Sequence, residues 1–212
     1  MRTFLKWVVV LAVPAIWVAA AWPQEPALPE GTTVKLLLLR QKSVQKELDV
    51  SADVAKKVMA FTEQQSEAFG KAVGMAESER KTAVAQLLGQ NKKFLADTLN
   101  AKQNTRLDQL YLQVTAPYQL TKADTAKALN LTEDQQQKLK DLYKEYRKET
   151  GDTFFGKDTE GRAEKFAKVR EKTRTKILSI VTEKQQAQAR ERVGPPFTGE
   201  LVFEENELVK KK

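Results

Sequence analysis

Leu131-Thr132-Glu133-Asp134-Gln135 is the clearest of four short segments that share one pattern. An aliphatic residue comes first, Ser, Asn or Thr follows it, and three of the four segments end in Gln. This order is typical of a helix start, because the small polar side chain accepts a hydrogen bond from a main-chain N–H and the Gln reaches back to the cap. The other segments are Val50-Ser51-Ala52-Asp53-Val54, Leu99-Asn100-Ala101-Lys102-Gln103 and Val181-Thr182-Glu183-Lys184-Gln185.

The motif residues are therefore interpreted as structural helix caps rather than as direct contacts to a partner. The capping side chains are Ser51, Asn100, Thr132 and Thr182, the reciprocal glutamines are Gln103, Gln135 and Gln185, and the aliphatic residues before the caps include Leu99, Leu131 and Val181.

The four segments also pair along the chain. Lys46 to Ser51 matches Lys127 to Thr132 at an offset of 81 residues, and Leu99 to Gln103 matches Val181 to Gln185 at 82 residues. Two landmarks at nearly the same offset indicate an internal duplication. We predict one helical repeat over residues 34–120 and a second over residues 121–196.

Nearly the whole chain from Val34 onward has the composition and periodicity of helices, and no segment alternates as a strand does. We predict an all-α fold of two tandem repeats of long amphipathic hairpins, broken at Gly70 and Gly74 and again over residues 151–161. One such repeat buries only a thin core, so two repeats packed together or a homodimer would be more stable. The expected core stripes include Val58, Phe61, Leu95, Leu139, Leu142, Tyr143, Tyr146 and Ile177.

The N-terminus has the pattern of a secretory signal peptide. Arg2 and Lys6 precede an apolar run that ends in Ala19-Ala20-Ala21, and the run is shorter than a membrane-spanning helix needs. We predict a signal peptide over residues 1–21 with cleavage after Ala21, and hence a periplasmic protein. An uncleaved anchor, which would add membrane association, is the alternative. Residues 22–33 are expected to form an extended linker, and residues 197–212 a tail that docks through Phe197, Leu201 and Phe203.

Composition excludes many functions. The 212-residue chain has a formal charge of +8, but its Lys and Arg are interspersed with acids, so no nucleic-acid surface is expected. It contains no Cys and no His, which rules out disulfides, metal sites built on those residues and nucleophilic catalysis by them. We expect no enzyme activity, no metal, no cofactor and no small-molecule substrate.

Two Leu-Thr-x-x-Gln-like motifs per helical unit, in a basic chain with an export signal, resemble the Spy/CpxP family of periplasmic proteins, also called the LTxxQ family. The motif is intact at Leu131, Thr132 and Gln135. In that family one unit with two motifs forms a four-helix subunit, and two subunits dimerise into a curved cradle. The resemblance implies that the two halves of this chain form such a cradle within one polypeptide. It also implies an ATP-independent chaperone or a regulator of the envelope stress response.

Two functional hypotheses follow from these observations. The first is a chaperone that binds unfolded or partly folded envelope proteins through a shallow apolar and basic surface. The alternative is an adaptor that binds the periplasmic domain of a sensor kinase. Phe154 and Phe155, in a stretch rich in Gly and Asp, are the candidate client contacts, with Arg147 and Lys148 beside them. The opposing interpretation is that this stretch folds back and buries both rings.

Overall fold

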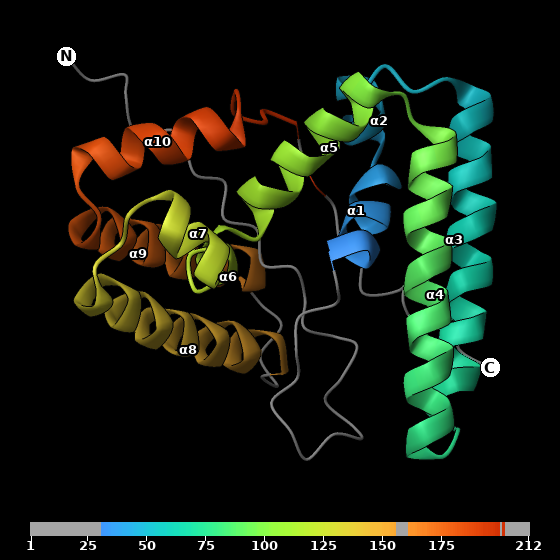
Figure 1. The fold of residues 1–212 in the computed structure, drawn as a ribbon, viewed down its shortest axis with the longest axis horizontal. Coiled ribbons are helices and arrows are strands. Elements are labelled where there is room, and N and C mark those ends of the chain that lie inside the picture. The colour runs from blue at the N-terminus through green and yellow to red at the C-terminus, as the bar shows by residue number, and fades with distance from the viewer. Residues whose placement is uncertain (1–30, 156–160, 200, 202–212) are drawn as a thin grey trace. The chain divides into compact units, whose positions relative to one another are not determined.

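The structure is a computed structural model that describes residues 31–155, 161–199 and 201, without the side chains at 154, 155, 162 and 163. The predicted signal peptide, most of the predicted linker and the tail beyond residue 201 lie outside the described residues. Every regular element in the described part is an α-helix, so the all-α prediction is confirmed (Figure 1). The described part divides into two compact units, an N-terminal unit of residues 31–111 with residues 198, 199 and 201, and a C-terminal unit, Leu112–Phe197. The division falls inside α5 (Ala101–Val114).

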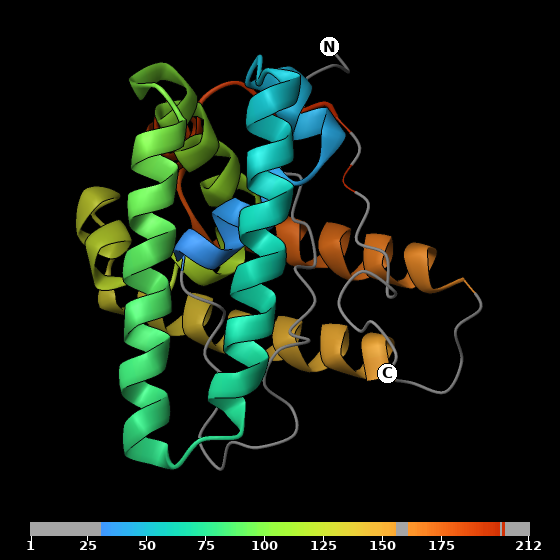
Figure 2. The same cartoon turned by 90° about the vertical axis from the view of Figure 1, so that its right-hand side faces the viewer.

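A long antiparallel hairpin forms the body of the N-terminal unit, and Figures 1 and 2 show its two helices, α3 and α4, side by side. The Phe61 and Phe94 rings stack between them with centroids 3.9 Å apart. The short apolar helix α1 packs on both, and it buries Val34, Leu36, Leu38 and Leu39. The helices of this unit before α5 are α1 (Gly31–Leu39), α2 (Lys42–Glu47), α3 (Ala52–Val73) and α4 (Glu77–Thr98).

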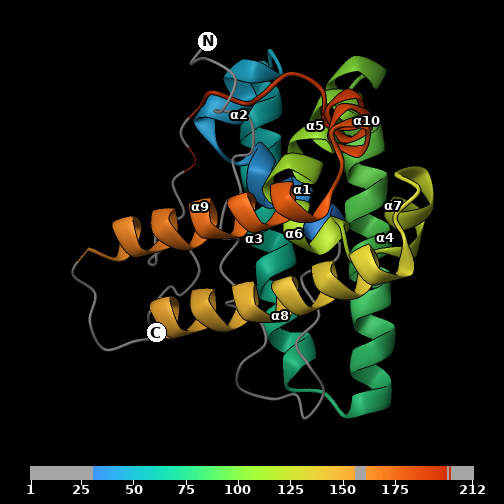
Figure 3. The same cartoon turned by 90° about the vertical axis from the view of Figure 1, so that its left-hand side faces the viewer.

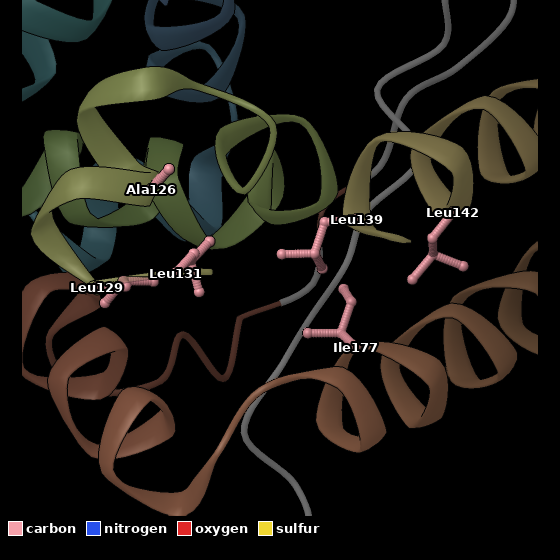
Figure 4. Close-up of a cluster of buried hydrophobic side chains, with 6 residues drawn as sticks. All are labelled: Ala126, Leu129, Leu131, Leu139, Leu142 and Ile177. Carbon is pink, nitrogen blue, oxygen red and sulfur yellow. The ribbon is translucent and has the colours of Figure 1, made fainter. Parts of the chain in front are cut away.

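The C-terminal unit has a second hairpin, formed by α8 and α9, which Figure 3 shows side by side. Its core gathers Leu139 and Leu142 of α8, Ile177 of α9 and three residues in and after α7, and Figure 4 shows Leu139 and Ile177 close together. The helices of this unit after α5 are α6 (Ala116–Gln119), α7 (Ala123–Ala128), α8 (Glu133–Phe155), α9 (Arg162–Ile180) and α10 (Glu183–Val193).

Ion pairs join the two helices of the second hairpin. Lys172 Nζ lies 2.8 Å from Glu145 and also contacts Glu149, and Lys176 Nζ lies 2.6 Å from Glu145. Hydrogen bonds from Lys172 and then from Lys176 lower the pKa of Glu145 from 4.5 to about 2, against the opposing effect of burial. Burial of the neighbouring Tyr146 ring raises the pKa of its phenol.

Two of the motifs, those at the starts of α3 and α8, begin with an aliphatic residue that also ends the preceding helix. Val50 N–H donates to the Gln45 carbonyl at 2.8 Å, and Leu131 N–H donates to the Ala126 carbonyl at 2.9 Å. Both bonds span a residue with positive φ, Asp49 at 51° and Asn130 at 49°. This is the Schellman arrangement, in which a left-handed residue ends one helix and an apolar residue follows it. The residue that follows, Ser51 or Thr132, is then the N-cap of the next helix.

The predicted break at Gly74 is confirmed, whereas the breaks predicted at Gly70 and from Gly151 and the end of the linker lie elsewhere. Gly70 lies inside α3, which runs on to Val73 and ends at Gly74. Gly151 lies inside α8, so Phe154 and Phe155 are the last two residues of a helix rather than part of a loop. A glycine costs a helix interior only about 1 kcal/mol, which packing against the partner helix offsets. The predicted linker is also too long, because α1 begins at Gly31.

Candidate functional site

In the C-terminal unit each motif caps its own helix in both directions. The Thr132 hydroxyl accepts from Gln135 N–H at 3.2 Å, while Gln135 Oε1 accepts from Thr132 N–H at 3.0 Å. Thr182 and Gln185 repeat this arrangement at 3.3 and 2.9 Å. Both helix starts are reciprocal capping boxes, which satisfy two main-chain donors at once.

The same two glutamines also connect the two helix starts. Gln135 Nε2 donates to the Ile180 carbonyl at 2.8 Å, and Gln185 Nε2 donates to the Asn130 carbonyl at 3.1 Å. The side-chain amides of Gln135 and Gln185 also hydrogen-bond to each other. The motif therefore holds the start of α8 against the start of α10, in addition to capping each helix.

The N-terminal unit has one half of this arrangement. Asn100 and Gln103 form the reciprocal cap of α5 at 2.9 and 3.0 Å, and Gln103 Nε2 donates to the Leu48 carbonyl at 2.9 Å. At the start of α3, Ser51 accepts from Val54 N–H at 3.3 Å. Val54 has no side-chain amide that could hydrogen-bond to the side chain of Gln103. Leu99 and Leu131 are buried, and Val181 packs against the C-terminal core.

An apolar groove of about 350 Å³ opens in the C-terminal unit, between α9, α10, the short helices α6 and α7, and the last turn of α5. Two of its floor residues, Leu129 and Ile177, belong to the core shown in Figure 4. The floor is therefore an open edge of that core. The remaining aliphatic lining residues, among them Leu112, Leu120, Leu178, Val181, Ala189 and Val193, are only half-buried.

Three arginines and no acidic residue line this groove. Arg174 is held by Glu171, whose carboxylate lies 2.8 Å away. Arg190 and Arg192 are exposed and make no ion pair with any of the described residues. Gln185, Ala189 and Val193 of α10 line the groove together with these two arginines, whereas Glu191 is not part of the lining. The groove therefore combines an apolar floor with a positively charged rim.

Buried Gln113 fixes one end of the groove. Its Nε2 donates to the carbonyls of Val193 and Pro195 at 2.8 and 2.9 Å, and its Oε1 accepts from Phe197 N–H at 2.9 Å. One side chain thus fixes the end of α10 and the chain that leaves it. Phe197 is buried, whereas Phe203, the other ring proposed for docking the tail, lies outside the described residues.

The structure does not place the candidate client contacts predicted from the sequence in this groove. The guanidinium of Arg147 lies 6.0 Å from the centroid of the Tyr143 ring, and Lys148 is exposed. The Phe154 and Phe155 side chains lie outside the described part of the chain. Sequence reasoning missed Gln113, Ala189, Arg190 and Arg192. The low apolar content of α10 is typical of a solvated helix and gave no indication of a groove.

A scan against protein-family models finds no match to this chain, and searches of curated proteins and of solved structures likewise find none. Within the described residues, no helix has both the length and the apolar character needed to cross a membrane. The same part of the chain brings no three acidic side chains together in a way that could hold a metal ion.

Proposed function

We propose that this protein is an exported, ATP-independent chaperone-like protein, and that it binds unfolded or partly folded envelope proteins. The observation that carries the proposal is the groove of the C-terminal unit, where half-buried aliphatic side chains lie beside two unpaired arginines, as judged within the described residues. Unfolded chains expose aliphatic residues that folded proteins bury, and such a floor can shield them from water.

The charge of the rim suits a transient interaction. Exposed cations attract acidic segments over a distance of about 10 Å at moderate salt, and they speed the encounter more than they strengthen the complex. A groove of about 350 Å³ is near the lower end of ligand pockets, which run from roughly 300 to 1,000 Å³. It holds a few side chains and not a folded domain, so a client would be released easily.

Two predictions from the sequence support the same proposal, namely the signal peptide over residues 1–21 and the resemblance of the paired motifs to the Spy/CpxP family. The hydrogen bonds between the caps in the C-terminal unit give those motifs a structural role, and Val181 and Gln185 of the second motif also line the groove. In this proposal the two repeats together form one curved cradle. Small-angle scattering that showed two separated lobes would contradict the cradle.

Suppression of aggregation is the test of the chaperone function. Purified residues 22–212 are mixed with a chemically unfolded model protein, without ATP, at low and at high salt. We expect suppression that weakens as salt rises, because the rim charges are exposed. Absence of suppression at every ratio, together with tight binding to one folded sensor domain, would favour the regulatory adaptor instead.

A matched pair of variants connects that activity to the groove. Arg190→Gln with Arg192→Gln removes two positive charges at the groove, whereas Lys168→Gln with Lys184→Gln removes two exposed charges that are not part of its lining. Both variants have the same net charge. We expect the first to lose most of its suppression at low salt and the second to retain it.

A further inference from the structure

The groove lies where the two halves of the chain carry different residues. At the offset of 82 residues that relates the motifs, Ala189 corresponds to Leu107 and Arg192 to Leu110. Leu107 and Leu110 are 0% and 1% exposed. The two aliphatic side chains that α5 buries at these positions are thus missing from α10.

The residues around those two positions remain aliphatic in both halves. Leu48 corresponds to Leu129 at an offset of 81, and Leu95 and Leu99 correspond to Ile177 and Val181 at an offset of 82. All three counterparts in the C-terminal unit line the groove. The groove is therefore an apolar site with the same aliphatic surroundings as in the first half, but without the two leucines on one helix face.

We propose that the groove is the binding site for an amphipathic helical segment of a client. That segment carries two aliphatic side chains one turn apart, followed by a carboxylate. This inference rests on the proposed function, since it takes the groove as the client site. The aliphatic pair replaces what Ala189 and Arg192 no longer supply. Residues three apart on a helix lie on one face, and helices that dock in grooves use such anchors.

The rim selects the carboxylate. Neither Arg190 nor Arg192 forms an ion pair with a described acidic residue. The groove lining contains no Asp or Glu that would repel an acidic client segment. Arg174 is already paired with Glu171. A carboxylate on the guest would pair with one of the two free guanidiniums, and bidentate pairing of this kind is a strong charge-assisted interaction. A basic segment with the same aliphatic pair would meet only like charge.

The experiment measures binding of labelled peptides to the protein purified from cells that express the full chain, by fluorescence anisotropy. The probe is an alanine-based helical peptide of about 15 residues with leucines three apart and glutamates one turn further on. A second peptide carries lysines in place of the glutamates. We expect the acidic peptide to bind roughly tenfold more tightly at low salt, and this ratio to reverse in Arg190→Glu with Arg192→Glu.

Two variants in which an alanine of α10 is replaced by leucine test the position of this binding site. Ala189→Leu places a leucine in the groove, as Leu107 has it, and Ala187→Leu places one on the exposed side of the same helix. We expect the first variant to lose at least roughly tenfold in affinity for the acidic peptide and the second to bind like the parent protein. Circular dichroism and melting temperature show that both are folded.

The outcomes separate this inference from the proposed function. Undiminished binding to Ala189→Leu, or equal binding of the acidic and basic peptides to the parent protein, would overturn the inference. If Ala189→Leu still suppresses aggregation as the parent does, the chaperone function stands and its client site lies elsewhere. If the peptides bind as expected but no aggregation is suppressed, the helix-binding site is supported and the chaperone function is contradicted.

Discussion

The side-chain amides of Gln135 and Gln185 face each other and exchange two hydrogen bonds. Gln135 Nε2 donates to Gln185 Oε1 at 2.9 Å, and Gln185 Nε2 donates to Gln135 Oε1 at 3.0 Å. Each Oε1 also accepts from the main-chain N–H of its own cap, and each Nε2 also donates to a main-chain carbonyl. An amide offers two donors and two acceptor sites, so both side chains are fully satisfied.

A charged isostere at this pair should be costly. Gln185→Glu keeps the shape of the side chain but replaces two donors with an acceptor that faces the Asn130 carbonyl and Gln135 Oε1. Gln185 is 8% exposed, so we expect a loss of about 3 kcal/mol at neutral pH in urea unfolding. Acidification should recover part of the loss, because a protonated carboxyl is again a donor. Gln188→Glu on the same helix is the control, and equal losses in the two variants would contradict the role assigned to the pair.

The N-terminal unit should gain stability from the missing partner. Val54 occupies the position that corresponds to Gln135, and Gln103 already donates to the Leu48 carbonyl. Val54→Gln would add a capping acceptor for Ser51 N–H and a donor for Gln103 Oε1, and we expect a gain of about 1 kcal/mol in thermal unfolding. The gain should shrink when Gln103→Ala is also present, because only the capping acceptor for Ser51 N–H then remains. Ala60→Gln, on an exposed turn of α3, is the control for helix propensity.

Local chemistry was enough to predict where α3, α5, α8 and α10 start. Thr132 with Gln135 has the spacing of a capping box, and both cap bonds form within a single turn of chain. The link between Gln135 and the Ile180 carbonyl could not be predicted, because it joins residues 45 positions apart. Only the fold brings those two groups together.

Breaks and the groove were harder to predict for two different physical reasons. Gly151 was predicted to end a helix. The free-energy cost of a glycine inside α8 is smaller than the stabilisation that α8 gains by packing on α9. The groove forms because positions 189 and 192 lack the buried leucine side chains of Leu107 and Leu110. A missing apolar side chain produces no periodic pattern in the sequence of a single helix. Comparison with Leu107 and Leu110 exposes it only after the two halves are known to fold alike around the motifs.

The ion pairs of the second hairpin predict a pH dependence of stability. Hydrogen bonds from Lys172 and Lys176 lower the pKa of Glu145 to about 2, so the charged carboxylate favours the folded state. That contribution is complete above pH 4.5 and is lost as the pH falls toward 2. Because the Glu145 side chain is 39% exposed, we expect Glu145→Gln to cost less than about 1 kcal/mol at neutral pH.

Melting temperature against pH checks this assignment. Glu145→Gln should lower the melting temperature at pH 6 and converge with the parent protein near pH 2, and high salt should shrink the difference. Glu63→Gln, on an exposed turn of α3, is the control for loss of a carboxylate. Parallel profiles for the parent protein and Glu145→Gln would show that these ion pairs contribute nothing measurable.

Gln113 should control the order of the C-terminal end of α10. Gln113→Leu keeps the apolar bulk but leaves the Val193 and Pro195 carbonyls and Phe197 N–H without their partner. Loss of such a buried partner costs about 1–3 kcal/mol for each group left unsatisfied, less where water can enter. We expect a loss of about 3 kcal/mol in stability, with amide exchange faster at Phe197 and across the last turn of α10 than in α8. Gln188→Leu serves as the control, and unchanged exchange at Phe197 would mean that the buried ring alone holds the chain in place.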